Sequence, residues 1–109
     1  MLLLFLIHAS QGEVTAFTMG FSVNFNNSKI SGDIEATLAT SDVWEAVISN
    51  GTINGAFVEF GLDKLKLNNA GGVTGSAGGI FTGTDGFVGA FSMSDGTEHI
   101  QGVGLLTTP

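Results

Sequence analysis

The chain has 109 residues, a formal net charge of −7 and only three cations, Lys29, Lys64 and Lys66. Nucleic-acid binding requires clustered Lys or Arg, so this balance argues against a nucleic-acid partner. The 17 Gly residues disfavour long helices, because each costs about 1 kcal/mol in a helix interior. The absence of Cys excludes disulfides, thiolate metal sites and Cys nucleophiles. We therefore expect a single domain, residues 1–109, built of strands.

The N-terminal segment, residues 1–12, has two interpretations. Leu2–Ile7 is apolar enough for the core of a signal peptide, and His8–Ser10 offers small residues for its exit. The basic residues that normally precede such a core are missing. The apolar run is also far shorter than the roughly 20 residues that a membrane-spanning helix needs. We favour a first strand over the remnant of a signal segment, and we expect no transmembrane helix.

Two alternating runs predict the first clear β-hairpin. From Thr18 to Phe25, apolar residues alternate with small or polar ones, which is typical of a strand with one buried face. The same alternation runs from Ile30 to Leu38 and places Asp33 and Glu35 on the solvated face. Asn26–Lys29 lies between the runs and is predicted to be a turn, because Asn tolerates left-handed backbone angles.

The middle of the chain predicts two further strands, Val43–Ser49 and Thr52–Phe60. Asn50-Gly51 between them is expected to form a tight hairpin turn, because this dipeptide suits the positive φ angles of a type I′ turn. Leu62–Leu67 either extends the second strand or pairs with it. Asn68–Gly72 is the clearest loop.

The last third of the chain predicts three strands, Val73–Phe81, Phe87–Met93 and Glu98–Leu106. Glycines and bulky apolar residues alternate through this region. A small closed barrel needs such a mixture, because its tapering interior places small residues beside large ones. We therefore predict an all-β fold, a small eight-stranded antiparallel up-and-down β-barrel.

Residue parity predicts which side chains of this region face inward. Phe81, Phe87 and Phe91 share a parity, so they should point into the barrel, while Val88 and Ser92 should point outward. The N-terminal apolar segment Leu2–Ile7 and a neighbouring protein are the two candidate covers for an outward Val88.

The same region carries a family resemblance. Gly79–Gly83, a short polar loop and Phe87–Phe91 resemble the signature of the transferrin-binding protein B β-barrel superfamily, in which Gly-x-Phe-x-Gly precedes a small-rich apolar strand. The motif consists of Gly79, Phe81, Gly83, Phe87, Gly89 and Phe91. On a pattern reading, the resemblance covers residues 18 to 106. The loop Gly83–Gly86 lacks the Pro and Glu found there in many members.

This resemblance implies a non-catalytic binding or structural domain of a surface lipoprotein-like protein. It would be exported to the cell surface, outer membrane or periplasm of a Gram-negative bacterium and would engage a protein partner through its loops. The loop residues expected to take part are Asn68, Asn69, Gly83, Thr84 and Asp85. The alternative is a barrel that carries an apolar ligand such as haem or lipid, which would require a cavity.

No residue pattern points to catalysis, a metal or a cofactor. His8 and His99 are the only imidazoles, and His99 is expected to be a surface residue near a turn. Asp33 and Glu35 share a strand face, but their alternation with apolar residues suits a solvated face equally well. Trp44 is expected to lie in the core. We therefore predict that the protein is not an enzyme and binds no cofactor.

Overall fold

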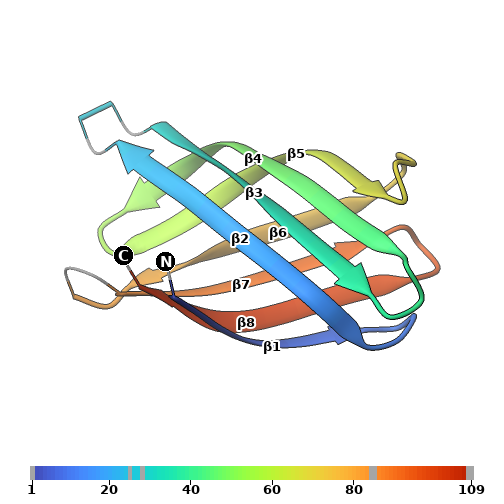
Figure 1. Ribbon diagram of the computed structural model, residues 1–109. Coiled ribbons are helices and arrows are strands. Elements are labelled where there is room, and N and C mark those ends of the chain that lie inside the picture. The colour runs from blue at the N-terminus through green and yellow to red at the C-terminus, as the bar shows by residue number, and fades with distance from the viewer. Residues whose placement is uncertain (1, 25, 28, 84–85, 108–109) are drawn as a thin grey trace.

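The computed structural model describes residues 2–24, 26–27, 29–83 and 86–107. Within these ranges eight antiparallel strands form one sheet that curls into a nearly closed barrel (Figure 1). In chain order they are β1 (Leu2–Ala9), β2 (Val14–Asn24), β3 (Lys29–Leu38), β4 (Val43–Asn54), β5 (Phe57–Leu67), β6 (Thr74–Phe81), β7 (Gly86–Ser94) and β8 (His99–Thr107). The predicted fold class is confirmed.

In the described part of the chain, the first strand of the barrel pairs with the last strand but not with the second. Strands β2 to β8 pair in chain order, and β1 pairs with β8 along its whole length. No ladder joins β1 to β2 within the described ranges; only an isolated bridge, Ala9 to Gly12, links them at their shared turn. In Figure 1 the two strands meet at the right and diverge toward the left, where both termini lie. The resulting opening is called the β1–β2 seam.

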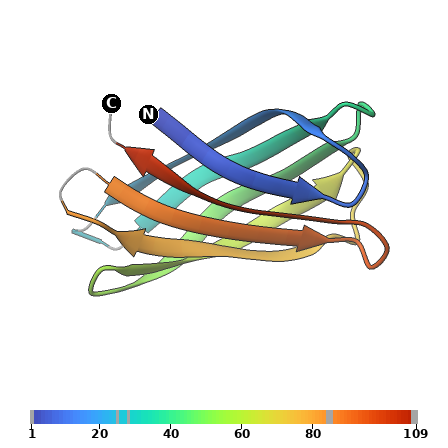
Figure 2. The ribbon, with the colours of Figure 1, turned by 90° about the horizontal axis from the view of Figure 1, so that it is seen from below.

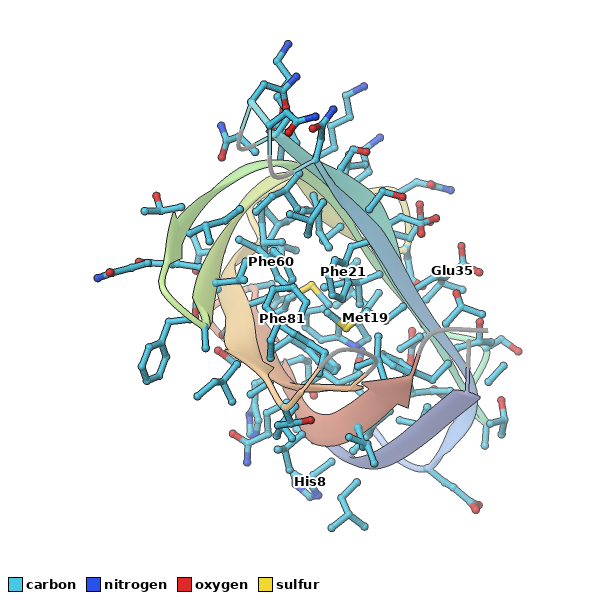
Figure 3. The ribbon with its side chains drawn as sticks, turned by 90° about the vertical axis from the view of Figure 1, so that its left-hand side faces the viewer. His8, Met19, Phe21, Glu35, Phe60 and Phe81 are labelled. Atoms are coloured by element: carbon cyan, nitrogen blue, oxygen red, sulfur yellow. The ribbon has the colours of Figure 1, made fainter. Side chains whose placement is uncertain are left out.

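The hydrophobic core lies inside the barrel. Trp44, Ala36 and Ile100 are completely buried, which confirms the core position predicted for Trp44. Figure 3 shows Met19, Phe21, Phe60 and Phe81 pointing into the barrel, while Glu35 and His8 point away from it. Inward and outward side chains alternate as expected of a strand with one buried face.

The inward parity predicted for the last third is also confirmed. Phe87 is 3% exposed and Phe91 is 4% exposed, and Phe81 is half-buried against the core. Val88 and Ser92 are exposed. A methyl group at Gly79 would lie 2.5 Å from the ring of Phe87, so the small residues make room for the phenyl rings.

The turn predicted at Asn50-Gly51 is wrong. Strand β4 continues to Asn54, and the turn to β5 is made by Gly55, with φ of 62°, and Ala56. Asn54 pairs with Phe57, so the two central residues of the turn are Gly55 and Ala56, and of these only Gly55 has a positive φ. Glycine at the first central position is typical of a type II′ hairpin turn. Asn50-Gly51 instead follows a shift in the β4–β5 register, where Ile48 pairs with Leu62 but Asn50 pairs with Gly61. Such a shift marks a β-bulge.

The structure also defines the limits of three strands, β2, β5 and β1, more closely than the sequence did. Strand β2 begins at Val14 rather than at Thr18. Leu62–Leu67 extends β5 and does not form a separate strand. The N-terminal apolar segment forms β1, which pairs with β8.

Candidate binding surface

The charged residues of the strands lie in only one half of the barrel. Strands β6, β7, β8 and β1 contain no Asp, Glu, Lys or Arg, and we call them the uncharged half. Every charged residue within a strand lies on β3, β4 or β5. We call β2 to β5 the charged half. Figure 2 views the uncharged half from outside, with β7, β8 and β1 toward the viewer.

Apolar side chains form two rows on the outer face of the uncharged half, beside exposed polar residues such as Ser76, Ser92 and Gln101. The register brings Leu6 opposite Val103 and Val103 opposite Ala90, so one row crosses β1, β8 and β7. A neighbouring row crosses β8, β7, β6 and β5. It consists of Leu105, Val88, Ile80 and Phe57. Leu6 is 78% exposed and Phe57 is 64% exposed, so these rows face solvent.

A shallow groove runs across this face. Its floor is made of small residues on β6 and β7, among them Ser76, Gly78 and Ala90. Leu6 and Val103 border it on one side, and Phe57 and Glu59 border it on the other. Small residues between tall apolar ones give a surface a concave shape, which suits a complementary side chain or strand.

His8 lines the groove, and the ring of His99 lies near that of His8. The rings of His8 and His99 are 5.9 Å apart between centroids, and both residues are exposed, as predicted for His99. Among the residues whose placement is described, no group of three or more His, Cys, Asp or Glu is positioned to hold a metal ion. Two imidazoles alone fall short of the four ligands of a structural zinc site.

The loop residues expected to bind a partner lie at opposite ends of the barrel. Asn68 and Asn69 belong to the β5–β6 loop at the right of Figure 1, and Gly83 belongs to the β6–β7 loop at the left. Thr84 and Asp85, which complete that second loop, lie outside the described residues. A partner seated on one rim therefore reaches only one of the two loops.

The Asn68 side chain forms hydrogen bonds that connect its loop to the neighbouring turn. Its side-chain oxygen accepts a hydrogen bond from the backbone N–H of Val43 at 2.8 Å, and its amide donates to Asp42 at 2.8 Å. A hydrogen bond from the Thr40 hydroxyl, which has the larger effect, and one from Asn68 lower the pKa of Asp42 below its usual value. These contacts bind the β5–β6 loop to the β3–β4 turn.

The other turns at this rim are held in similar ways. The Ser10 hydroxyl donates to the carboxylate of Glu98 at 2.6 Å, joining the β1–β2 and β7–β8 turns. Backbone N–H groups of Glu98 and Thr97 lower the pKa of Asp95. Gln11 accepts a hydrogen bond of 2.9 Å from the indole N–H of Trp44, so its side chain reaches the core.

Phenyl rings pack against one another inside the barrel. The ring centroid of Phe21 lies 5.0 Å from that of Phe60 and 4.8 Å from that of Phe87. Phe17 stacks on Phe91 with centroids 5.3 Å apart. An apolar ligand inside the barrel would have to displace these rings, so the packing gives no support to the carrier alternative.

The sequence did carry a signal for the apolar outer surface. In β7 and β8, apolar residues occupy both parities, since Val88 and Val103 lie opposite in parity to the buried Phe87 and Leu106. A covering role for the N-terminal segment over Val88 was one expectation. Strand β8 instead lies between β1 and β7, and Val88 is 38% exposed.

Comparison of the chain with protein-family models, with curated proteins and with solved structures gave no match. In the part of the chain that is described, no helix has the length and apolar character needed to cross a membrane.

Proposed function

We propose that the chain is a non-catalytic binding domain of an exported bacterial surface protein, and that its uncharged half holds a protein partner. The observation that carries this proposal is the exposed apolar face across β1, β8, β7, β6 and the start of β5. Contiguous apolar surface on a soluble domain typically marks an interaction site. Interface cores are depleted in charged residues, as this half of the barrel is.

The shape of the surface supports a protein rather than a small molecule. The groove is open along its length and floored by Gly78 and Ala90, so it would leave a small ligand largely in water. Small-molecule sites bury most of their ligand. Phe57 stands exposed at one border and has the size of an interface anchor.

The surface location and the bacterial class rest on the family resemblance. Gly79–Gly83 and Phe87–Phe91 resemble the transferrin-binding protein B barrels, which are surface domains of Gram-negative bacteria. We accordingly propose the cell surface, the outer membrane or the periplasm as the location. The resemblance also favours the loops as the contact, and this competes with the contact through the apolar face.

Retention experiments separate the two contacts. The chain is immobilised and exposed to host serum and, separately, to envelope proteins of a Gram-negative bacterium. Val88→Lys places a charge in the apolar face, and Val47→Lys makes the same change on the outer face of β4, where Val47 is 37% exposed. We expect a protein retained by the wild type to be retained by Val47→Lys and lost with Val88→Lys, because a buried unpaired charge is costly.

Three outcomes would contradict the apolar face as the contact. In the first, no protein is specifically retained from either source. In the second, Val88→Lys retains the partner as well as the wild type does. In the third, retention is lost only when the loop Asn68–Gly72 is replaced. The last result would place the contact on the rim, as the family resemblance implies.

A further inference from the structure

One edge of the sheet, along β1, has backbone groups that no strand pairs within the described residues. In an antiparallel ladder, the N–H and C=O of alternate residues point to the same neighbour. The Ser10 N–H donates to the carbonyl of His99 at 2.9 Å, so Ser10 points toward β8. Ala9 points the other way, since its carbonyl accepts from Gly12. The same alternation holds for the rest of β1. The backbone N–H and C=O groups of Leu3, Phe5 and Ile7 therefore point into the β1–β2 seam, as those of Ala9 do.

The β1 edge lacks three of the features that normally prevent edge pairing, namely charged residues, Pro and β-bulges. Natural proteins protect such edges with charges, Pro or β-bulges. Strand β1 has no charged residue and no Pro, and its register with β8 runs without a shift from Leu2 to Ala9. The β2 edge differs, because its register with β3 shifts between Val14 and Ala16. A bulge of this kind bends a strand away from further pairing.

We propose that two copies of this chain associate by antiparallel pairing of β1 with β1 of the second copy. This goes beyond the proposed function, because it uses the strand edge and leaves the outer faces of β6, β7 and β8 available. A register centred on Phe5 places it opposite Phe5 of the second copy and places Leu3 opposite Ile7. Each facing pair then exchanges two backbone hydrogen bonds, since all three residues point into the seam.

The distribution of charge makes a second copy the fitting occupant of this edge. Each copy carries a net charge of −7, so contact through the charged half would bring like charges together. Strands β1 and β8 contain no Asp, Glu, Lys or Arg, so the contact between two β1 edges brings no charged strand residue to the twofold axis. The second copy also supplies an extended strand of equal length with the same alternation.

The dimer would enlarge the candidate binding surface. Pairing across β1 keeps the outer faces of both copies on the same side of one continuous sheet. Leu6, which is 78% exposed and lies beside the edge, would then contact the second copy. The apolar rows of the two uncharged halves would meet across the axis.

Hydrogen exchange of the full chain tests the pairing residue by residue. In dilute protein, the amides of Leu4 and Leu6 are bonded to β8 and should exchange slowly, whereas those of Leu3, Phe5 and Ile7 should exchange fast. In concentrated protein, the second set should become protected as well. Equal exchange of Leu3, Phe5 and Ile7 at both concentrations would overturn the proposal.

Sedimentation equilibrium of two matched variants tests the location of the contact. Leu6→Lys places two like charges beside the axis, and Val47→Lys makes the same change on the charged half. We expect Leu6→Lys to weaken the dimer by at least about tenfold and Val47→Lys to leave it unchanged. Circular dichroism of both variants checks that the barrel remains folded.

A wild-type chain that sediments as a monomer at all concentrations would overturn the proposal. So would a dimer that survives Leu6→Lys, or one that is disrupted only by Val88→Lys, since that result would place the contact on the outer face. These measurements use the purified chain alone. Their failure therefore leaves the retention experiments, and the proposed function, to be decided separately.

Discussion

The charged and uncharged halves of the barrel are alike inside and different outside. Both bury a regular inward row, with Trp44 and Ile48 in one half and Phe87 and Phe91 in the other. Outside, the charged half presents charged residues such as Asp33 to solvent, whereas the strands of the uncharged half have none and expose apolar residues such as Leu6 and Val103 beside polar ones. A stable core explains the inward rows. It does not explain an apolar exterior, and the exterior is therefore where function is to be sought.

The halves also differ in how they fill the interior. The charged half uses branched aliphatic residues and one Trp, as at Ile34 and Trp44. The uncharged half sets phenyl rings over glycines. A methyl group at Gly102, for example, would lie 2.6 Å from the ring of Phe91. Glycine-rich strands are flexible in isolation, so packing of the rings has to define this half.

The largest expected effect comes from removing an inward ring. Phe87→Ala and Trp44→Ala should each lower the free energy of unfolding by about 3–5 kcal/mol, because each leaves a cavity in a packed core. Ser92→Ala, on the exposed face of β7, should change it by no more than about 0.5 kcal/mol. Urea denaturation measures all three. A small effect of Phe87→Ala beside a large one of Trp44→Ala would show that the uncharged half is loosely packed.

A smaller effect tests whether the glycines of the uncharged half are required. Gly79→Ala should cost about 1–3 kcal/mol, because the added methyl group collides with the Phe87 ring and the Val88 carbonyl. Gly20→Ala in β2 is the matched control, since beyond its two chain neighbours no atom lies within 4 Å of the added methyl group. It should be neutral or stabilising in the same urea titration. Equal losses at both positions would mean that the rings do not depend on the glycines.

Alternation of residue types was sufficient to predict most of the fold. From Thr18 to Leu38 the outward positions are polar or small, so the pattern gave both the strands and their buried faces. In β7 both parities are apolar or small, and only the spacing of Phe87 and Phe91 showed which face lies inside. The turn was misplaced at Asn50-Gly51 because the Asn-Gly preference is local, whereas the register of β4 with β5 places the loop at Gly55-Ala56.

The candidate surface was harder to predict than the fold. It forms from residues far apart in the chain, such as Leu6, Val88 and Phe57, which become neighbours only through strand pairing. The loops around Asn68 and Gly83 were easier to notice as polar and glycine-rich segments. The sequence did not show that they lie at opposite ends, or that Asn68 is engaged by Val43 and Asp42.

An effect of similar size to that of Gly79→Ala tests the β1–β2 turn, which connects the two halves. Gln11 precedes β2, and its side chain is the hydrogen-bond partner of the buried Trp44 indole. Gln11→Ala should lower the free energy of unfolding by about 1–3 kcal/mol, because a buried donor is left without an acceptor. Gln101→Ala, at an exposed position of β8, is the control and should have almost no effect. Trp44 is the only Trp, so its fluorescence follows unfolding directly. Equal behaviour of the two variants would argue that water replaces the lost bond.

The smallest expected effect compares one turn from each half as the pH falls. Asp42, between β3 and β4, and Asp95, between β7 and β8, both have a pKa below the usual value of 3.8 in the folded chain. A lowered pKa stabilises the fold above the unfolded-state value and ceases to do so as the pH falls through the folded-state value. Stability should therefore decline below about pH 4. Asp42→Asn and Asp95→Asn should each flatten the decline slightly, because both groups are exposed and screened by water. Urea midpoints measured between neutral and acidic pH test this. If only Asp42→Asn changes the pH dependence of the urea midpoint, the hydrogen bonds at Asp95 do not stabilise the β7–β8 turn. The turns at this end of the barrel would then be stabilised mainly by contacts of the charged half.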